Sequence, residues 1–426
     1  MKGRNEVDAV LHYDLAVIGG GPAGMAAALE ARERGVEKII ILERAATLGG
    51  ILEQCIHAGF GLHYFKQELS GPEYANRFIV QLRDSDIEVK VDTMVLSIGD
   101  NNVITATNNT DGLIEIEATA IVLAMGCRER PRGAINISGS RCSGIMTAGT
   151  AQKYVNIDGY MPGHKVVILG SGDIGLIMAR RMTLEGAKVE MVCELLPFSS
   201  GLTRNIVQCL EDMNIPLKLS CTVVSTHGKD RLEGVTIADV DKNLRPIPGT
   251  EKYIECDTLL LSIGLIPENE LSRMAGIELD RVTNGPVVDE YRQTSRPGIF
   301  ASGNVLQVHD LVDYVTIESK LAGAGAARYI KNKAAQGRTV GTKGINGVRY
   351  VVPQKINADT DGDVTLYFRV GAVYKNAKLV VSCGDRVILT KKRPRMCPSE
   401  METLVIGKDV IASIPENEQL TVRVEE

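Results

Sequence analysis

Three closely spaced glycines interrupt the chain where a β-type run gives way to a helical one. The apolar run Leu15–Ile18 ends at G-G-G-P-A-G (19–24), and an alanine-rich segment with helical character follows. The glycines fit the pattern G-x-G-x-x-G. In this pattern the first glycine permits a tight turn, the second lets backbone approach a pyrophosphate, and the third packs the helix on the strand. These residues are Gly19, Gly21 and Gly24.

One acidic residue completes this pattern. Glu43 follows the next apolar run, Ile39–Leu42, and stands 24 residues beyond Gly19 (19 to 43). A carboxylate there can accept hydrogen bonds from a ribose diol, while the helix N-terminus offers free N–H groups to the phosphates. Glycines alone are a weak signal. With a strand before them, a helix after them and an acid at this distance, they indicate a dinucleotide site.

The same arrangement returns in the middle of the chain. The apolar run Val166–Leu169 precedes Gly170, Gly172 and Gly175, and a helical run follows. Glu194 again lies 24 residues beyond the first glycine (170 to 194). Two independent matches with equal spacing make chance a poor explanation, so the sequence predicts two dinucleotide sites.

Each of the two copies is also followed by an apolar run that ends at a glycine. A continuous apolar run ends at Ala124 and Gly126 after the first copy, and the run Thr258–Ile263 ends at Gly264 after the second. Several short β-type runs separated by Gly, Asn and Asp turns precede Ala124. They predict a small antiparallel meander that returns to a buried parallel sheet.

The last third of the chain changes character. A short apolar run ends at Gly303-Asn304, and an Ala- and Gly-rich helix is expected from roughly Tyr314 to Lys331. Gly, Lys and Thr accumulate over Gln336–Gly347, which we interpret as a linker. From Val348 to Glu426, short β-type runs alternate without a long helical one. This part predicts a small β domain, such as a sandwich.

Composition limits the classes of partner. The 426 residues suggest about three domains, and 44% hydrophobic content is ordinary for a globular chain. A formal net charge of −5 gives no electrostatic case for nucleic acid or an anionic membrane. No apolar run approaches a transmembrane segment, and the charged N-terminus is not a signal peptide. Nine cysteines without a C-x-x-C pair argue against a metal or iron–sulfur site and favour a reducing cytoplasm.

With these pieces in place, the chain resembles the two-dinucleotide FAD/NAD(P) oxidoreductases of the glutathione and thioredoxin reductase superfamily. The likeness covers about Tyr13 to Ile330. The pieces that carry it are G-G-G-P-A-G (19–24), A-M-G (124–126), G-S-G-D-I-G (170–175), S-I-G-L-I-P (262–267) and G-I-F-A-S-G-N (298–304).

Shorter motifs narrow this likeness. Within the superfamily the chain is similar to the branch that holds opine oxidase A subunits, cyanide synthase B subunits and sarcosine oxidase α subunits. It looks most like stand-alone bacterial proteins often found with an FAD-dependent glycerol-3-phosphate dehydrogenase. The motifs are Q-C-I-H-A-G-F-G-L (54–62), C-R-E-R-P-R-G (127–133), T-A-G-T-A-Q (147–152), V-H-D-L-V-D (308–313) and P-S-E-M (398–401).

The resemblance implies an α/β fold with two Rossmann-like dinucleotide-binding domains plus a small C-terminal β domain. The FAD-binding domain would occupy 1–150 and 266–340, the NAD-binding domain 151–265 and the β domain 341–426. Residues implied to bind FAD are Gly19, Gly21, Gly24, Glu43, Arg44, Gly50 near the isoalloxazine, Ala124, Gly126, Gly303 and Asn304. Those implied to bind NAD(H) are Gly170, Gly172, Gly175, Glu194 and Gly264.

Two details of the implied flavin site depend on the last segment. Asn304 stands where many relatives have an Asp bound to the ribitol of the flavin, and an amide can keep that hydrogen bond. The helix after Val308 would point its positive end at the flavin ring.

One departure from the superfamily bears on chemistry. Disulfide reductases place a C-x₄-C pair just after the double glycine, and thioredoxin reductases place a C-x-x-C in the NAD domain. Here Ile51 and Leu52 follow Gly49-Gly50, and Cys55 stands alone. Without a dithiol relay, electrons that leave the flavin must pass directly to a substrate, to oxygen or to another protein.

Several single residues allow two interpretations. Cys55 is either a redox thiol beside the flavin or a small buried side chain. His57 and His309 are either acid–base groups near the ring or structural histidines. Asp310 and Asp313 fit the start of the expected helix. Because hydride transfer between cofactors requires no side-chain base, the sequence identifies no catalytic residue.

We therefore expect an FAD-dependent NAD(P)H oxidoreductase without a redox-active disulfide. It would exchange a hydride between NAD(H) and flavin and pass electrons to or from a partner dehydrogenase of glycerol-3-phosphate or amino-acid/opine type. The alternatives are a self-contained NADH oxidase that uses oxygen and an electron-transfer or assembly subunit without turnover alone. The C-terminal β domain would serve docking or homo-oligomer formation.

Overall fold

The structure is a computed structural model that describes residues 10–332 and 337–426. The chain forms two compact units. The first unit comprises the chain up to Cys127 together with everything from Pro267 onward, and the second unit is Arg128–Ile266. Residues 128–150, which the resemblance assigns to the first part of the FAD-binding domain, lie in the second unit. They do so because β10 (Ser138–Gly139) and β11 (Ile145–Thr147) pair with strands of that unit.

The first unit is built on a sheet whose central strand is β1 (Leu11–Ile18). β1 pairs in parallel with β2 (Ile39–Leu42) on one side and with β8 (Gly112–Leu123) on the other. β20 (Ile299–Ala301) also runs parallel to the last residues of β8. The carboxyl ends of these strands therefore meet at one edge. The predicted meander is present as β6 (Met94–Ile98), β7 (Val103–Asn108) and the first half of β8. Its expected first run, 87–91, instead forms β5 (Glu88–Lys90), which pairs in parallel with β2.

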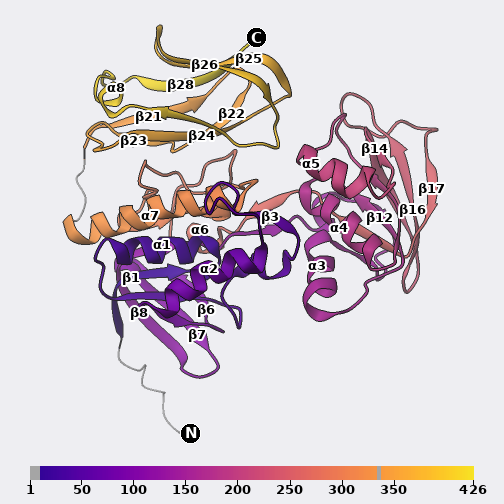
Figure 1. The fold of residues 1–426 in the computed structure, drawn as a ribbon, viewed down its shortest axis with the longest axis horizontal. Helices are drawn as coiled ribbons and strands as arrows, with labels where there is room; N and C mark the ends of the chain where they lie inside the picture. The colour runs from indigo at the N-terminus through magenta and orange to yellow at the C-terminus, as the bar shows by residue number, and fades with distance from the viewer. Residues whose placement is uncertain (1–9, 333–336) are drawn as a thin grey trace. The chain divides into compact units, whose positions relative to one another are not determined.

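Two helices that are far apart in sequence lie side by side in this unit (Figure 1). They are α1 (Pro22–Glu33) and α7 (Val312–Asn332), the second being the helix predicted from Tyr314. Their close approach requires small residues: a Cβ on Gly323 would lie 2.3 Å from the backbone oxygen of Ala27. The other elements of this part are α2 (Gly71–Arg83), β3 (Ala58–Phe60), β4 (Leu69–Ser70), β5 (Glu88–Lys90), β6 (Met94–Ile98), β7 (Val103–Asn108) and α6 (Glu270–Met274).

The second unit repeats the plan of the first. A parallel sheet runs in the order β11-β18-β12-β13-β14, and a smaller sheet runs β10-β15-β16-β17. The parallel strands bury their apolar side chains in two clusters, one with α3 and α4 and one with the smaller sheet. Its remaining elements are α3 (Ala148–Lys153), β12 (Lys165–Leu169), α4 (Asp173–Leu184), β13 (Lys188–Cys193), α5 (Thr203–Ile206), β14 (Leu217–Lys218), β15 (Cys221–Gly228), β16 (Leu232–Asp239), β17 (Lys252–Glu255) and β18 (Thr258–Leu261). The short strands β9 (Cys127–Glu129) and β19 (Leu265–Pro267) lie where the chain passes between the units.

The C-terminal part is the predicted β domain. Two sheets, β23-β21-β28-β25-β26 and β22-β24-β27, share one buried apolar core. One short helix, α8 (Lys408–Ala412), was not predicted. The strands are β21 (Thr339–Gly344), β22 (Val348–Val352), β23 (Lys355–Asn357), β24 (Val364–Val370), β25 (Tyr374–Cys383), β26 (Arg386–Met396), β27 (Glu402–Ile406) and β28 (Gln419–Glu425).

The predicted linker Gln336–Gly347 is wrong over half of its length, where it forms a strand. Gln336 lies outside the described residues, but β21 occupies much of the rest and buries Val340. β21 pairs in parallel with β28, at the far end of the chain. Its Gly- and Lys-rich sequence hides a strand because the partner, and not the local composition, stabilises it.

The C-terminal β domain packs into the core of the first unit. Val352 is completely buried and belongs to the same apolar cluster as Val288 and Leu306. The amide of Val288 donates to Gln354 Oε1 (3.0 Å), and its carbonyl accepts from Gln354 N (3.2 Å). The carboxylate of Glu290 accepts from both Asn357 N and Asn357 Nδ2 (2.9 Å each). The domain is therefore part of the first unit's packing.

We expect Val352→Ala to destabilise the protein by about 1.5–3 kcal/mol. It deletes two buried carbon groups at ~0.8 kcal/mol each and leaves a cavity. The measurement is the denaturant midpoint at constant slope. Val387→Ala is the matched control because Val387 is 54% exposed on β26, and its change should stay within about 0.5 kcal/mol. Equal shifts for the two variants would contradict a shared core.

Candidate functional site

The residues predicted for the first nucleotide gather at one edge of the sheet. Gly19, Glu43 and Ala124 directly follow β1, β2 and β8, and Gly303 lies two residues beyond Ala301, the last residue of β20. Ligands of open α/β sheets bind outside the carboxyl ends of parallel strands. The topology thus brings together residues that are nearly 300 positions apart in the sequence (19 to 303).

The three glycines of the first turn occupy three different environments. A Cβ on Gly19 would lie 2.4 Å from Ala124 O, and one on Gly24 would lie 1.8 Å from Gly19 O. At Gly21 the nearest atom is Gly50 Cα, at 3.9 Å. The first and third glycines are therefore required for packing, while the second leaves room beside the N-terminus of α1. This cradle fits the pyrophosphate of a dinucleotide.

A second glycine turn lies against the first. Gly49 N donates to Gly20 O (3.0 Å), and a Cβ on Gly50 would approach Gly21 Cα to 3.0 Å. Gly50 also has a left-handed φ of +58°, which disfavours larger residues. The structure therefore places Gly50 at the predicted cradle. Arg44, by contrast, is exposed next to Glu43.

Glu43 organises this turn through its carboxylate. Its Oε2 accepts from Gly20 N (2.6 Å), and its Oε1 accepts from Ala45 N (2.7 Å). The residue is buried, and these bonds hold its side chain in one orientation. A carboxylate offers about four acceptor positions, which leaves capacity for two ribose hydroxyls.

The second unit contains an equivalent cradle. A Cβ would lie 2.0 Å from Ser262 O at Gly170 and 2.5 Å from Gly170 O at Gly175, whereas at Gly172 the nearest atom is 3.3 Å away. Glu194 repeats the bonds of Glu43: Oε2 accepts from Ser171 N (2.8 Å) and Oε1 from Leu196 N (2.9 Å). The duplication seen in the sequence is therefore a duplication of geometry.

Two further glycines leave open space at their own cradles. Gly126 in the first unit and Gly264 in the second have φ values of +70° and +102°. A Cβ on either would have no atom within 4 Å. Backbone conformation, and not crowding, therefore favours glycine at these two positions.

The side chain of Asn304 has a defined orientation. Its Oδ1 accepts from His309 N (3.0 Å), and its Nδ2 lies 3.5 Å from Cys127 Sγ. Because an amide N–H must face an acceptor, the oxygen points to His309 and the NH₂ group remains a donor. A donor at this position fits a ribitol hydroxyl as its acceptor.

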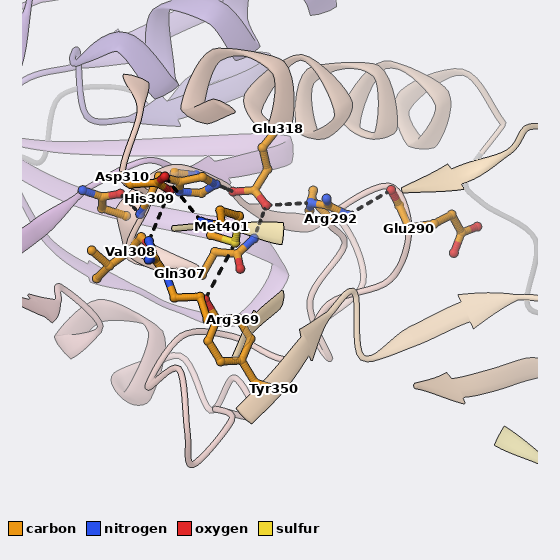
Figure 2. A network of polar contacts seen from close by, with 12 residues as sticks. Glu290, Arg292, Gln307, Val308, His309, Asp310, Glu318, Tyr350, Arg369 and Met401 are labelled. Atoms are coloured by element: carbon orange, nitrogen blue, oxygen red, sulfur yellow. Dashed lines mark hydrogen bonds and ion pairs between the residues drawn. The ribbon is translucent and has the colours of Figure 1, made fainter. Parts of the chain in front are cut away.

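A completely buried carboxylate, Glu318 of α7, supports this loop (Figure 2). It accepts from Gly303 N (3.2 Å), Gln307 Nε2 (2.8 Å) and Arg292 Nε (3.2 Å). His309 Nε2 lies 3.2 Å from its Oε2. Burial alone would raise the pKa of Glu318, but the charges of His309 and Arg292 and the bonds from His309 and Gln307 lower it. Glu318 is therefore an ionised structural anchor.

This network favours the structural interpretation of His309. Its side chain is completely buried, and its Nε2 faces Glu318. Among the described residues, six buried polar atoms around this anchor lack a geometric hydrogen-bond partner: Arg292 Nη2, Ser302 Oγ, Gln307 Oε1, His309 Nδ1, Ser319 Oγ and His309 Nε2, the last of which meets Glu318 only as an ion-pair contact. No sequence signal pointed to Arg292, Gln307 or Glu318, because their roles arise from contacts between distant segments.

Asp313 connects the start of α7 to the glycine-rich motif at 54–62. Its Oδ1 accepts from Tyr64 N (2.7 Å), and its Oδ2 accepts from Gly61 N (3.2 Å). The prediction of a helix-start acid is correct in position, since Asp313 lies in the first turn. Its hydrogen bonds, however, hold a second loop rather than only the helix.

Cys55, the cysteine nearest in sequence to the double glycine, has the character of an unreactive thiol. Cys55 donates to Ile51 O (3.3 Å), and burial raises its pKa to about 12. A thiol that stays protonated at neutral pH is a poor nucleophile, which favours the structural interpretation. In the second unit, Cys193 and Cys221 are buried neighbours, and their hydrogen bond together with burial raises the pKa of Cys193. The sequence did not reveal this pair because 28 residues separate them (193 to 221).

The described residues contain neither a candidate metal site nor a candidate membrane helix. Over 10–332 and 337–426, no three His, Cys, Asp or Glu side chains are grouped so that they could hold a metal ion. Over the same ranges, no helix combines the length and apolar character needed to cross a membrane.

Comparison with known proteins identifies the family. Residues 13–328 match the model of the pyridine nucleotide-disulphide oxidoreductases. The chain belongs to this family. FAD and NAD(P)H are the family's cofactors, and the two cradles fit two such dinucleotides.

The individual relatives share only about a quarter of their aligned residues with this chain. The chain is 26% identical over 316 residues to the HcnB subunit of hydrogen cyanide synthase from Pseudomonas protegens. This alignment covers 68% of this chain and 65% of that protein. The chain is 27% identical over 317 residues to the A subunit of opine oxidase from Agrobacterium tumefaciens. This alignment covers 68% of this chain and 61% of that subunit. The chain thus spans less than two thirds of these curated relatives.

A solved structure supports the fold. The crystal structure of thioredoxin reductase from T. acidophilum superposes with a TM-score of 0.62 at 24% identity, covering 74% of this chain and 98% of that one. The predicted α/β class with two Rossmann-like domains is confirmed. The C-terminal β domain lies beyond the family match.

The glycine geometry yields a paired test. We expect Gly24→Ala to prevent stable folding, because its Cβ would overlap Gly19 O at 1.8 Å. Gly21→Ala should fold with nearly unchanged thermal stability but bind FAD at least about tenfold more weakly, because the methyl group fills the phosphate approach. Thermal unfolding and FAD titration of both variants measure this. Unchanged FAD affinity in Gly21→Ala would contradict the cradle.

Glu194 should make the enzyme prefer NADH over NADPH. A carboxylate about 4 Å from the extra phosphate costs roughly 1 kcal/mol in water and about 4 at an effective dielectric near 20. Leu195 and Leu196 follow where a phosphate-binding Arg would be expected. The ratio of kcat/KM values should therefore favour NADH by about fivefold to several hundredfold, and Glu194→Gln should narrow it. Equal efficiency in the unmodified protein would show that Glu194 does not meet the ribose.

Proposed function

We propose that this chain is an FAD-containing oxidoreductase that exchanges a hydride between NAD(H) and flavin and passes electrons to or from a partner dehydrogenase. FAD would be held by the first unit and NAD(H) by the second. The observation that carries this proposal is the duplicated cradle: a Cβ on the first or third glycine would lie 1.8–2.5 Å from a carbonyl oxygen, whereas the nearest atom lies 3.9 Å away at Gly21 and 3.3 Å away at Gly172. When bound, the cofactors supply the hydride chemistry itself.

The chain's own residues would bind and orient. The N-termini of α1 and α4 would direct the positive ends of their helix dipoles toward the two pyrophosphates. Glu43 and Glu194 are held by backbone amides in positions to accept ribose hydroxyls. Asn304 presents its NH₂ group as a donor, and Glu318 keeps the loop that carries it in place. No side chain is assigned a proton-transfer role.

The absence of a redox-active disulfide is part of the proposal. Cys55 is the cysteine nearest in sequence to the double glycine, and its thiol has a pKa raised to about 12. Cys193 and Cys221 are both fully buried in the apolar cluster shared by the two sheets of the second unit. Electrons would then leave the flavin without a thiol relay.

A partner dehydrogenase is supported by the relatives. The HcnB protein of hydrogen cyanide synthase and its opine oxidase counterpart are both named as subunits, so they work in complexes. A partner of glycerol-3-phosphate or amino-acid/opine type agrees with the motif likeness. An NADH oxidase of Methanocaldococcus jannaschii, 26% identical over 265 residues, keeps the oxygen-dependent alternative open.

The flavin should be the only redox centre. We expect the purified protein to be yellow, to release FAD on denaturation and to take up two electrons per chain in an anaerobic NADH titration. Cys55→Ser should leave this stoichiometry unchanged. Uptake of four electrons would contradict the proposal. If Cys193→Ser then took up only two electrons, the Cys193–Cys221 pair would be the second redox centre.

Turnover separates the functional alternatives. The proposal expects slow NADH consumption with oxygen and fast consumption with an artificial dye. Fast, saturable turnover with oxygen by the chain alone would establish the oxidase alternative. No turnover with any acceptor, despite bound FAD, would favour an assembly role without catalysis.

A further inference from the structure

Asp310, two residues before α7, is held by the C-terminal β domain (Figure 2). Its Oδ1 lies 3.3 Å from Arg369 Nη2, and its Oδ2 accepts from Met401 N (3.4 Å). The side chains of Asp310 and Arg369 are only 8% and 14% exposed. The sequence suggested a helix-start acid, but both carboxylate oxygens face another domain.

Arg369 binds more than this carboxylate. Its Nη2 also donates to Val308 O (3.0 Å), and its Nη1 donates to Pro398 O (3.2 Å). One guanidinium on β24 therefore joins three segments: the stretch before α7, the turn after β26 and its own strand. The planar fork of arginine makes this possible, and lysine cannot reproduce it.

The held segment is the one that carries the flavin-side residues. His309 lies between Val308 and Asp310, and its backbone amide fixes the oxygen of Asn304. The side chain of His309 faces Glu318, which in turn binds Gly303 N. A shift at Asp310 would thus move the backbone that orients Asn304 and the N-terminus of α7.

A second contact of the β domain reaches the same network. Arg292, which donates to Glu318, lies with its guanidinium carbon 5.5 Å from the centre of the Tyr367 ring. Tyr367 stands two residues before Arg369 on β24. The single strand β24 therefore braces both the buried anchor and the segment before α7.

Three motifs of the narrower likeness acquire a common explanation. V-H-D-L-V-D supplies Val308 and Asp310, P-S-E-M supplies Pro398 O and Met401 N, and the 54–62 motif is held by Asp313. Arg369 and Met401 both lie beyond residue 328, where the family match ends. This contact therefore joins Val308 and Asp310, inside the family match, to residues beyond it.

We propose that Arg369 is a positioning residue for the flavin site, acting through Asp310. In this arrangement the β domain completes the site by fixing the backbone from Gly303 to Val312, in addition to any docking role. The proposal rests on the proposed function in one respect, namely that FAD occupies the first cradle.

The decisive comparison is between two arginines of the same domain. Arg393 pairs with Glu402 (2.7 Å), and their side chains are 19% and 11% exposed, so burial and chemistry match Arg369–Asp310. The hydrogen bonds of the Arg393 guanidinium, however, go to Glu402 and to Thr403 O, which both belong to the β domain. Arg393→Met therefore reports the cost of losing an ion pair without disturbing the first cradle.

In the full chain, we expect Arg369→Met to weaken FAD binding about 10- to 100-fold, mainly through faster dissociation. Amide hydrogen exchange over residues 303–316 should accelerate at least about tenfold. Arg393→Met should change both quantities by less than about twofold, even where it lowers the thermal midpoint as much. Arg369→Lys, which keeps the charge but not the fork, should lie between, at about 3- to 10-fold weaker binding.

A double-mutant cycle tests the route through Asp310. Asp310→Asn combined with Arg369→Met should weaken FAD binding no more than about twofold beyond the worse single variant, because the two residues act as one unit. Additive losses of FAD affinity would show that Arg369 does not act through Asp310. Equal effects of Arg369→Met and Arg393→Met on FAD affinity and exchange would overturn the proposal.

Hydrogen exchange distinguishes a failure of this proposal from a failure of the proposed function. If the unmodified chain binds no FAD, the proposed function fails. Faster exchange over 303–316 in Arg369→Met, but not in Arg393→Met, would still show that Arg369 holds this segment in place. If FAD binds and neither FAD affinity nor exchange responds to Arg369→Met, the positioning role of Arg369 is overturned while the proposed function stands.

Discussion

A buried negative charge must be matched inside the protein, and Glu318 is the residue where this requirement organises the first unit. Isolated carboxylates are far too costly to remove from water, so partners must surround them. Here those partners come from the turn before β20, from Gly303 and from the segment that precedes α7. Satisfying one carboxylate thereby sets the positions of the loop that carries Asn304 and of the helix that begins after it.

The two nucleotide cradles obey a different constraint, that of backbone contact. In each, the first and third glycines allow strand, turn and helix to touch, with Cβ positions that would overlap carbonyl oxygens. The acid that follows the second strand then closes the turn by accepting from its amides. The equal spacing of Glu43 and Glu194 is the consequence, because the same strand–helix–strand geometry requires the same chain length.

The C-terminal β domain takes part in both kinds of packing. It buries Val352 in the core of the first unit and supplies donors for Glu290 and Asp310. Its own core is separate and rests on two facing sheets. A domain that contributes both apolar surface and charged partners to its neighbour is more than an appended module, and this explains why short motifs far apart in the chain share one location.

Local rules were sufficient for the glycine turns, the acids at 43 and 194, and the strands and helices that flank them. These features depend on backbone conformation and on apolar periodicity, which neighbouring residues determine. The tertiary structure alone decided the partners of Asp310, Asp313 and Glu318, the proximity of Cys193 and Cys221, and the strand β21 inside an apparent linker. Each of these depends on contacts between segments distant in sequence, and the free energy of such contacts leaves no trace in the composition or spacing of either segment.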